Sequence, residues 1–129
     1  MKKLGRLSET EMEVMQAIWE LATPVTVAQL LAVFEQSKGW KTSTLSTLLS
    51  RLIDKGFLEK NMAGKANVYE PALSWQEYQK YEAKSLLKTL YGGNVKNFVA
   101  ALVDDSGVTQ ADIKELMQWF QGKAGDINE

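Results

Sequence analysis

The segment Trp40–Lys60 constrains the fold most, because it predicts a helix whose two faces differ in chemistry. An apolar stripe at helical spacing is formed by Leu45, Leu48, Leu49 and Leu52. The other face consists almost entirely of small hydroxyl side chains and ends in a guanidinium: Ser43, Thr44, Ser46, Thr47, Ser50 and Arg51. A helix surface that only faces water normally carries residues that favour the helix more than Ser and Thr do. Short hydroxyl side chains let a helix approach another surface closely and form hydrogen bonds there, as a helix in a DNA major groove must.

The distribution of charge along the chain is consistent with a local contact to a polyanion. The net charge of −1 taken alone argues against nucleic acid. Residues 38–65, however, hold six basic side chains against two acidic ones, whereas residues 66–129 hold six lysines against nine acids. A basic segment in an acidic chain is typical of nucleic-acid contact, although a chance excess on a solvated surface explains the charge equally well.

Composition excludes several classes of function. A chain of 129 residues fits one globular unit or two small ones, and its apolar fraction of 45% is normal for a packed protein. The absence of cysteine and histidine removes disulfides, thiolate metal sites and the commonest general base. No apolar run is long enough to span a bilayer, and the N-terminus lacks the apolar core of a signal peptide. We therefore expect a cytoplasmic protein with no cofactor and no metal, and, without a nucleophile–base constellation, no enzyme.

Capping signals predict two helices ahead of the two-faced one. Ser8-x-x-Glu11 and Thr26-x-x-Gln29 both have the spacing of a capping box, and each precedes an amphipathic segment. The second helix is expected to end near Gly39, from which a short turn leads into the two-faced helix. Pro24-Val25, between the first two helices, has room for one or two strand residues. Two helices joined by such a turn match a helix-turn-helix.

A β-hairpin is predicted after the two-faced helix. Its strands are expected over Phe57–Ala63 and Asn67–Pro71, joined by the turn Gly64-Lys65-Ala66. Three helices followed by a hairpin make a winged helix. Lys60 and Lys65 would lie on or near the wing, where contact with phosphate and simple solvation are equally expected.

Three more helices are predicted beyond a boundary at residues 71–74. Residues 75–91 form the first, Asn94 caps the second, and Val108-Thr109-x-x-Asp112 begins the third. About 50 residues make a poor independent core, so a second copy is expected to cover the apolar stripes. Folding back onto the winged helix in a monomer is the alternative. The predicted dimerisation residues are Trp75, Tyr78, Leu86, Leu90, Val95, Phe98, Val99, Leu102, Ile113, Leu116, Met117 and Phe120.

The expected fold is therefore mainly α, with a winged helix-turn-helix over residues 1–73 and a three-helix dimerisation domain over residues 74–129. The leading hypothesis for function is a homodimer that binds double-stranded DNA. The predicted DNA-binding residues are Lys41, Ser43, Thr44, Ser46, Thr47, Ser50, Arg51, Lys60 and Lys65. The alternative is a winged helix that docks on a protein partner without reading DNA sequence, and the net charge of −1 is its best support.

The chain resembles the penicillinase repressor family, the BlaI/MecI/CopY group of bacterial winged-helix repressors. The matching pieces follow in order along nearly the whole chain: Glu13-Val14-Met15, Ile18-Trp19, Trp40, Thr44-x-x-Thr47-Leu48-Leu49-x-Arg51-Leu52, Lys55-Gly56, Tyr69 and Tyr91-Gly92-Gly93. The resemblance implies a homodimer that blocks transcription from an inverted-repeat operator. It also implies that Thr44, Thr47 and Arg51 face DNA, with Lys41 and Ser43 at the start of the reading helix.

The chain departs from the family pattern at positions that bear on specificity and induction. Ser46 stands where relatives often have Lys or Arg, which puts the usual TGTA/TACA-type half-site in doubt. Copper-responsive members carry cysteine pairs that this chain lacks. Members that respond to β-lactams are cleaved at an Asn-Phe bond, whose position falls near Ala100-Ala101 here, a few residues beyond Asn97-Phe98. The inducing signal, and an upstream sensor or protease as a partner, therefore stay open.

Overall fold

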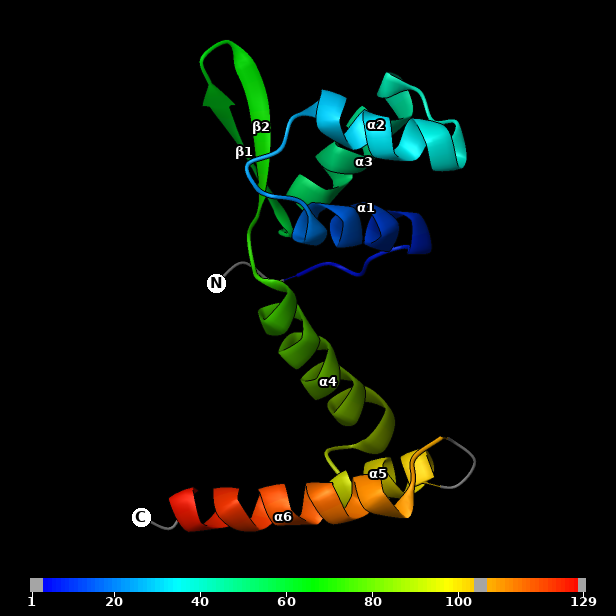
Figure 1. Cartoon of the computed structure of the whole chain (residues 1–129), viewed down its shortest axis with the longest axis vertical. Coiled ribbons are helices and arrows are strands. Elements are labelled where there is room, and N and C mark those ends of the chain that lie inside the picture. The colour runs from blue at the N-terminus through cyan, green and yellow to red at the C-terminus, as the bar shows by residue number, and fades with distance from the viewer. Residues whose placement is uncertain (1–3, 104–106, 128–129) are drawn as a thin grey trace. The chain divides into compact units, whose positions relative to one another are not determined.

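The computed structural model describes residues 4–103 and 107–127, with residues 124–127 given by backbone alone. The element order is α1 (Glu9–Glu20), α2 (Val27–Lys38), α3 (Thr42–Asp54), β1 (Leu58–Ala63), β2 (Ala66–Pro71), α4 (Trp75–Tyr91), α5 (Val95–Val103) and α6 (Gln110–Ile127) (Figure 1). This order confirms the expected fold class, which is mainly helical with a two-stranded wing. The chain divides into two compact units, one up to Gln79 and one from Lys80 onward.

Side-chain caps begin the first two helices. The Ser8 hydroxyl accepts a hydrogen bond from the Glu11 N–H at 3.2 Å, and the Glu11 carboxylate accepts one from the Ser8 N–H at 2.8 Å. Thr26 and Gln29 exchange the same pair of bonds at 3.2 and 2.9 Å. These bonds satisfy backbone donors that a helix start leaves without partners. Both predicted capping boxes are confirmed, and Gly39 ends α2 in the left-handed conformation (φ 66°) as expected.

The core of the N-terminal unit is formed by α1, α2, α3 and the base of the hairpin. The four leucines of the α3 stripe are at most 6% exposed. They belong to one buried cluster with Val14, Met15, Ile18, Val25, Leu30, Phe34, Phe57, Leu58, Tyr69, Leu73 and Tyr78. Because the stripe is fixed in this core, the opposite face of α3 is turned toward solvent.

The wing is a tighter hairpin than predicted. Ala66 pairs with Ala63, so the turn consists of Gly64 and Lys65 alone. The prediction that Ala66 belongs to the turn is therefore wrong by one residue. Gly64 has a positive φ of 65°, and a glycine in the first position suits a two-residue hairpin turn.

A third, one-residue strand supports the wing at its base. The Val25 N–H donates to the Tyr69 carbonyl at 3.0 Å, and the Tyr69 N–H donates to the Val25 carbonyl at 2.8 Å. This bridge confirms the one or two strand residues expected at Pro24-Val25. It attaches β2 to the segment that leads into α2.

The first turn of α4 packs within the N-terminal unit. Tyr78 is 8% exposed, with its ring centroid 5.2 Å from that of Trp19 and 5.6 Å from that of Phe57. The Trp75 ring also lies 5.2 Å from Trp19, whose indole N–H donates to the Leu73 carbonyl at 3.0 Å. The unit therefore extends past the expected boundary after residue 73, because these aromatic rings continue its core.

The C-terminal unit consists of the rest of α4 with α5 and α6. The Asn94 side chain accepts from the Asn97 N–H at 3.0 Å at the start of α5, as predicted. Thr109 and Asp112 form the predicted capping box of α6, with bonds of 2.9 and 3.1 Å. No helix in the part of the chain that the structure describes has the length and apolar character needed to cross a membrane.

Candidate DNA-binding surface

The polar side chains that were predicted for the outward face of α3 all lie on that face. All six are exposed: Ser43, Thr44, Ser46, Thr47, Ser50 and Arg51. They lie opposite the buried leucines, and the helix that bears them is held by α1, α2 and the hairpin. The structure thus brings the predicted α3 residues together on one rigid, solvent-facing surface.

The hydroxyl groups on this face are in two different states. The Thr47 hydroxyl donates to the Ser43 carbonyl, one turn earlier in the helix, at 3.0 Å. Among the described residues, none engages the hydroxyl of Ser43, Thr44, Ser46 or Ser50 in a hydrogen bond. Four of the five hydroxyls therefore keep their full capacity to donate and accept.

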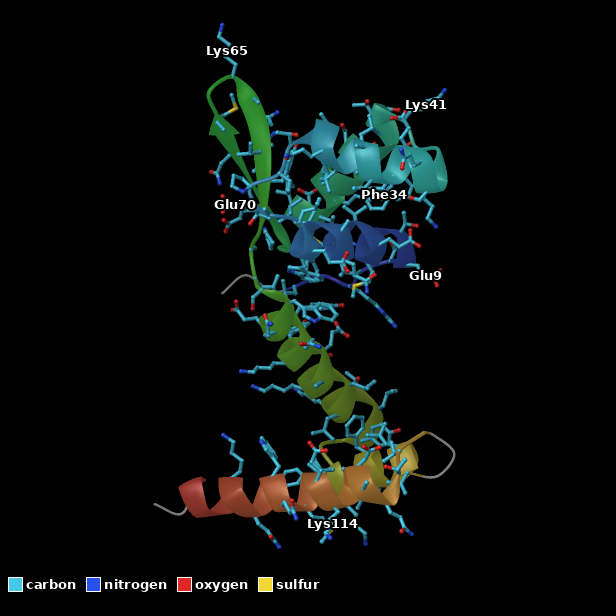
Figure 2. The ribbon with its side chains drawn as sticks, viewed as in Figure 1. Glu9, Phe34, Lys41, Lys65, Glu70 and Lys114 are labelled. Carbon is cyan, nitrogen blue, oxygen red and sulfur yellow. The ribbon has the colours of Figure 1, made fainter. Side chains whose placement is uncertain are left out.

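Four basic side chains accompany the α3 face. Lys41 immediately precedes α3, Arg51 lies in its last turn, Lys60 is on β1 and Lys65 is in the hairpin turn. Figure 2 shows Lys41 and Lys65 directed outward on the same side of the N-terminal unit. No acidic side chain within the described residues forms an ion pair with any of the four. They are available to bind phosphate.

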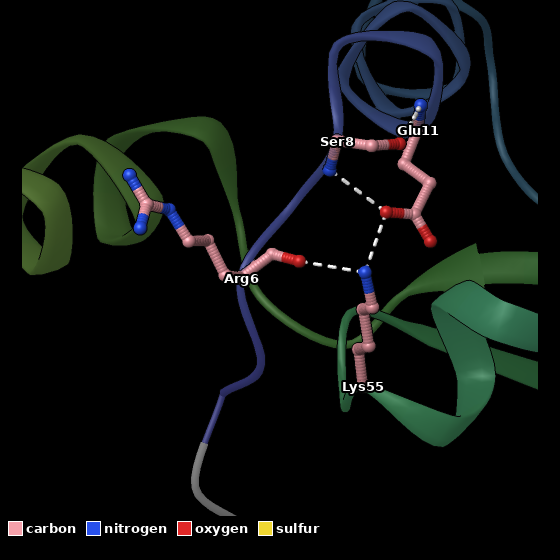
Figure 3. A network of polar contacts seen from close by, with 4 residues as sticks. All are labelled: Arg6, Ser8, Glu11 and Lys55. Carbon is pink, nitrogen blue, oxygen red and sulfur yellow. Dashed lines mark hydrogen bonds and ion pairs between the residues drawn. The ribbon is translucent and has the colours of Figure 1, made fainter.

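The other two basic residues of this segment form ion pairs with acidic residues of α1. The Lys55 ammonium lies 2.6 Å from the Glu11 carboxylate and also donates to the Arg6 carbonyl at 2.6 Å (Figure 3). Lys38 pairs with Glu13 at 3.3 Å on the surface. The outward-facing positive charge of residues 38–65 is thus smaller than their sequence indicates.

Glu11 has a structural role beyond its cap. It is only 1% exposed, and its Oε1 accepts from both Ser8 and Lys55 (Figure 3). Burial works to raise the pKa of Glu11, but the hydrogen bonds from Lys55 and Ser8 and the Lys55 charge outweigh it and hold that pKa below its ordinary value. Through this carboxylate the start of α1 is joined to Lys55, which caps the end of α3. The sequence shows the cap but gives no signal for the pair, because 44 residues separate its members.

The C-terminal unit exposes much of the apolar stripe predicted for dimerisation. Exposed members include Leu86, Leu90, Val95, Leu102, Leu116, Met117 and Phe120, whereas Phe98, Val99 and Ile113 are half-buried. A cavity of about 380 Å³ opens between α5 and α6, lined by Val99, Leu102, Val103, Val108, Asp112, Ile113, Leu116, Met117 and Phe120.

Trp119 was missed by the sequence reasoning. It is 55% exposed, and its ring lies 5.2 Å from that of Phe120. Its position, three residues after Leu116 on α6, was the signal that could have found it. Of the predicted dimerisation residues, Trp75 and Tyr78 instead pack on Trp19 in the other unit.

An exposed, hydroxyl-rich third helix, beside cations that pair with no acid of the described residues, is typical of winged-helix proteins that bind DNA. A family model described as "Penicillinase repressor" matches residues 7–122. The chain belongs to the penicillinase repressor family, whose members are transcriptional repressors.

Individual relatives match along most of their length. The penicillinase repressor of Bacillus licheniformis is 29% identical over 118 residues, covering 92% of this chain and 91% of the relative. The methicillin resistance regulatory protein MecI of Staphylococcus aureus (strain N315) is 25% identical over 114 residues, covering 88% and 92%. Among solved structures, monomeric Bacillus licheniformis BlaI in complex with the blaP half-operator is 32% identical, with a TM-score of 0.51, over 60% of this chain and 94% of that one.

Proposed function

We propose that this chain is a transcriptional repressor that binds an inverted-repeat DNA operator as a homodimer. The observation that carries the proposal is the exposed hydroxyl and guanidinium face of α3, held on a buried leucine stripe. The similarity to BlaI, whose solved complex contains a half-operator, supports it. The same similarity disfavours the rival role as a protein-interaction module. As a repressor the protein acts on cytoplasmic DNA and needs no catalytic residue.

In this proposal α3 enters the major groove with the first turns of its exposed face toward the base edges. The hydroxyls of Ser43, Thr44, Ser46 and Ser50 can donate to or accept from bases and nearby phosphates. Lys41 and Arg51, at the two ends of the helix, supply charge for the phosphate backbone. Lys60 and Lys65 on the wing add further phosphate contacts, which fix the position of the domain without reading sequence.

The C-terminal unit is proposed as the dimerisation domain. Its exposed apolar residues on α4, α5 and α6 would be covered by the same helices of a second copy, as in a symmetric dimer. We assign residues up to Gln79 to DNA binding and residues from Lys80 to dimerisation, following the packing of the chain. Trp75 and Tyr78 are left out of the proposed interface because they contact Trp19.

Two candidate bonds for proteolytic release of the operator lie in α5. Asn97-Phe98 lies in the first turn of α5, where the Asn97 N–H is bonded to Asn94, and Ala100-Ala101 lies further along the same helix. Cleavage at either bond by a protease would require local unwinding of α5.

Operator binding by full-length protein tests the proposal, with DNA from upstream of the chain's own gene as the probe. Arg51→Ala removes an exposed cation from α3, so we expect at least a tenfold weaker affinity and a shallower dependence on salt. Lys38→Ala is the matched control, since Lys38 is occupied by Glu13, and it should change affinity less than twofold.

Gel shifts across a salt series measure both quantities. Equal affinity for wild type and Arg51→Ala would contradict the proposed contact between the outward face of α3 and DNA. The absence of any retarded fragment at low salt, including in a survey of genomic fragments, would favour the protein-interaction alternative.

A further inference from the structure

The two threonines on the outward face of α3 present different groups to a ligand. The Thr47 hydroxyl lies 3.0 Å from the Ser43 carbonyl oxygen. A carbonyl can only accept, so the single hydroxyl proton of Thr47 is donated to the helix backbone. Thr44 has no such bond to any residue that the structure describes. Thr47 therefore offers a partner its methyl group and an acceptor oxygen, but no donor.

Thr47 also occupies the middle of the outward face. Successive residues of a helix are rotated by about 100°, which places Thr47 opposite the leucine stripe, beside Ser43 and Ser50. It lies in the second turn of α3, in the part of a recognition helix that contacts base edges. No arginine, lysine, asparagine or glutamine lies between Thr42 and Ser50, so this part of the helix lacks the side chains that form paired hydrogen bonds with guanine or adenine.

We propose that Thr47 recognises a thymine through contact between its side-chain methyl and the C5-methyl group of the base, and that its hydroxyl serves the helix. Thymine is the base that presents a methyl group in the major groove, and a threonine methyl is one of the groups that contact it. This inference rests on the proposed function, since it requires α3 to enter the groove.

The test begins with DNA duplexes selected from a random pool by the full-length protein. Each thymine of the selected half-site is then replaced singly by deoxyuridine, which removes only the C5-methyl group. We expect one thymine per half-site to show about a fourfold loss of affinity, the equivalent of one buried methyl group.

Two substitutions separate the methyl of Thr47 from its hydroxyl. Thr47→Val keeps a methyl and removes the hydroxyl, and it should bind within twofold of wild type and still distinguish thymine from deoxyuridine. Thr47→Ser keeps the hydroxyl and removes the methyl. It should bind the thymine and deoxyuridine duplexes equally, and its affinity for the thymine duplex should be about fourfold weaker than that of wild type. Thr44→Ser, which loses a methyl elsewhere on the face, is the matched control and should keep the discrimination at that thymine.

The outcomes separate failure of the inference from failure of the proposed function. If no duplex is selected at low salt, the proposed function is wrong. If duplexes are selected but deoxyuridine is tolerated at every position, the methyl contact is wrong. Loss of binding by Thr47→Val would show that the hydroxyl oxygen accepts from adenine or cytosine instead, and loss of the discrimination by Thr44→Ser would assign the thymine to the other threonine.

Discussion

The two units of this chain differ in how far their apolar side chains are buried. In the N-terminal unit Phe57 is fully buried and Leu49 is 1% exposed, while the outward face of α3 is polar. In the C-terminal unit Phe120 is 48% exposed and Leu90 is 69% exposed. The first unit has a buried core of its own, whereas the second leaves many of its apolar side chains exposed. The difference supports the proposed division of the chain into a DNA-binding unit with its own core and a dimerisation unit, and substitutions in each unit test this proposal.

The largest effect is expected from the core of the N-terminal unit. Phe57→Ala removes a fully buried ring that packs against Tyr78, and it should lower the free energy of unfolding by about 3–5 kcal/mol. Urea denaturation of the full chain, followed by circular dichroism, measures the change. A loss below about 1 kcal/mol would show that this unit is not the independently packed part.

The corresponding ring of the C-terminal unit should affect association instead. Phe120→Ala removes an exposed ring that lines the cavity between α5 and α6, and we expect the dissociation constant of the homodimer to rise at least tenfold. Sedimentation equilibrium over a range of concentrations measures it. Lys114→Ala, on the same helix, is the control with little expected change. A wild-type chain that stays monomeric at all concentrations would overturn the proposed dimer.

Glu11→Gln tests whether the ion pair between Glu11 and Lys55 stabilises the fold of the first unit. Because Lys55 then lacks its charged partner, we expect a loss of about 1–3 kcal/mol at neutral pH. The folded-state pKa of Glu11 is depressed, so its contribution is present above the ordinary value of 4.5 and is lost as pH falls through the folded pKa.

The difference between wild type and Glu11→Gln should therefore shrink as the pH falls below 4.5, as denaturation curves from pH 7 to pH 3 can show. Glu13→Gln is the matched control, since Glu13 pairs with Lys38 on the surface and should contribute less than about 1 kcal/mol. A difference that persists unchanged at pH 3 would contradict this role of the Glu11 charge.

The smallest effects are expected from two capping boxes of the same design. Thr26→Ala and Thr109→Ala each remove a cap with bonds of 3.2 and 3.1 Å, worth about 1 kcal/mol. In the first unit the loss should lower the free energy of unfolding at every protein concentration. In the second it should also raise the dissociation constant of the dimer, so that the thermal midpoint gains less from a rising protein concentration. Identical concentration dependence for both variants would remove the distinction between the units.

Much of the helical structure could be predicted because helix starts depend on neighbouring residues. The capping boxes at Ser8 and Thr26 and the Asn94 cap each depend on residues within one turn of one another. One such signal was overlooked. Ser74 and Glu77 also form a reciprocal pair of bonds, at 3.1 and 3.0 Å, and the spacing Ser-x-x-Glu was visible in the sequence.

Contacts between distant residues could not be predicted in this way. The Glu11–Lys55 pair spans 44 residues, and the bond from Trp19 to the Leu73 carbonyl spans 54. Neither has a periodic signal, because each depends on how whole helices pack. The exposure of the α3 face followed from helical periodicity, but the state of the Thr47 hydroxyl depends on its side-chain rotamer, which the sequence does not show.

The bridge between Val25 and Tyr69 fixes the wing near its base and, among the residues that the structure describes, leaves its tip without a supporting strand. The hairpin is clamped on its β2 side by two hydrogen bonds at one point, and within the described residues no other strand pairs with that side. Toward the tip, residues 61–67 are all exposed. Thermal bending should therefore increase with distance from Tyr69, with slow amide exchange at the clamp and fast exchange near Lys65. A wing anchored in this manner can bend to follow the local width of a groove while the recognition helix stays fixed.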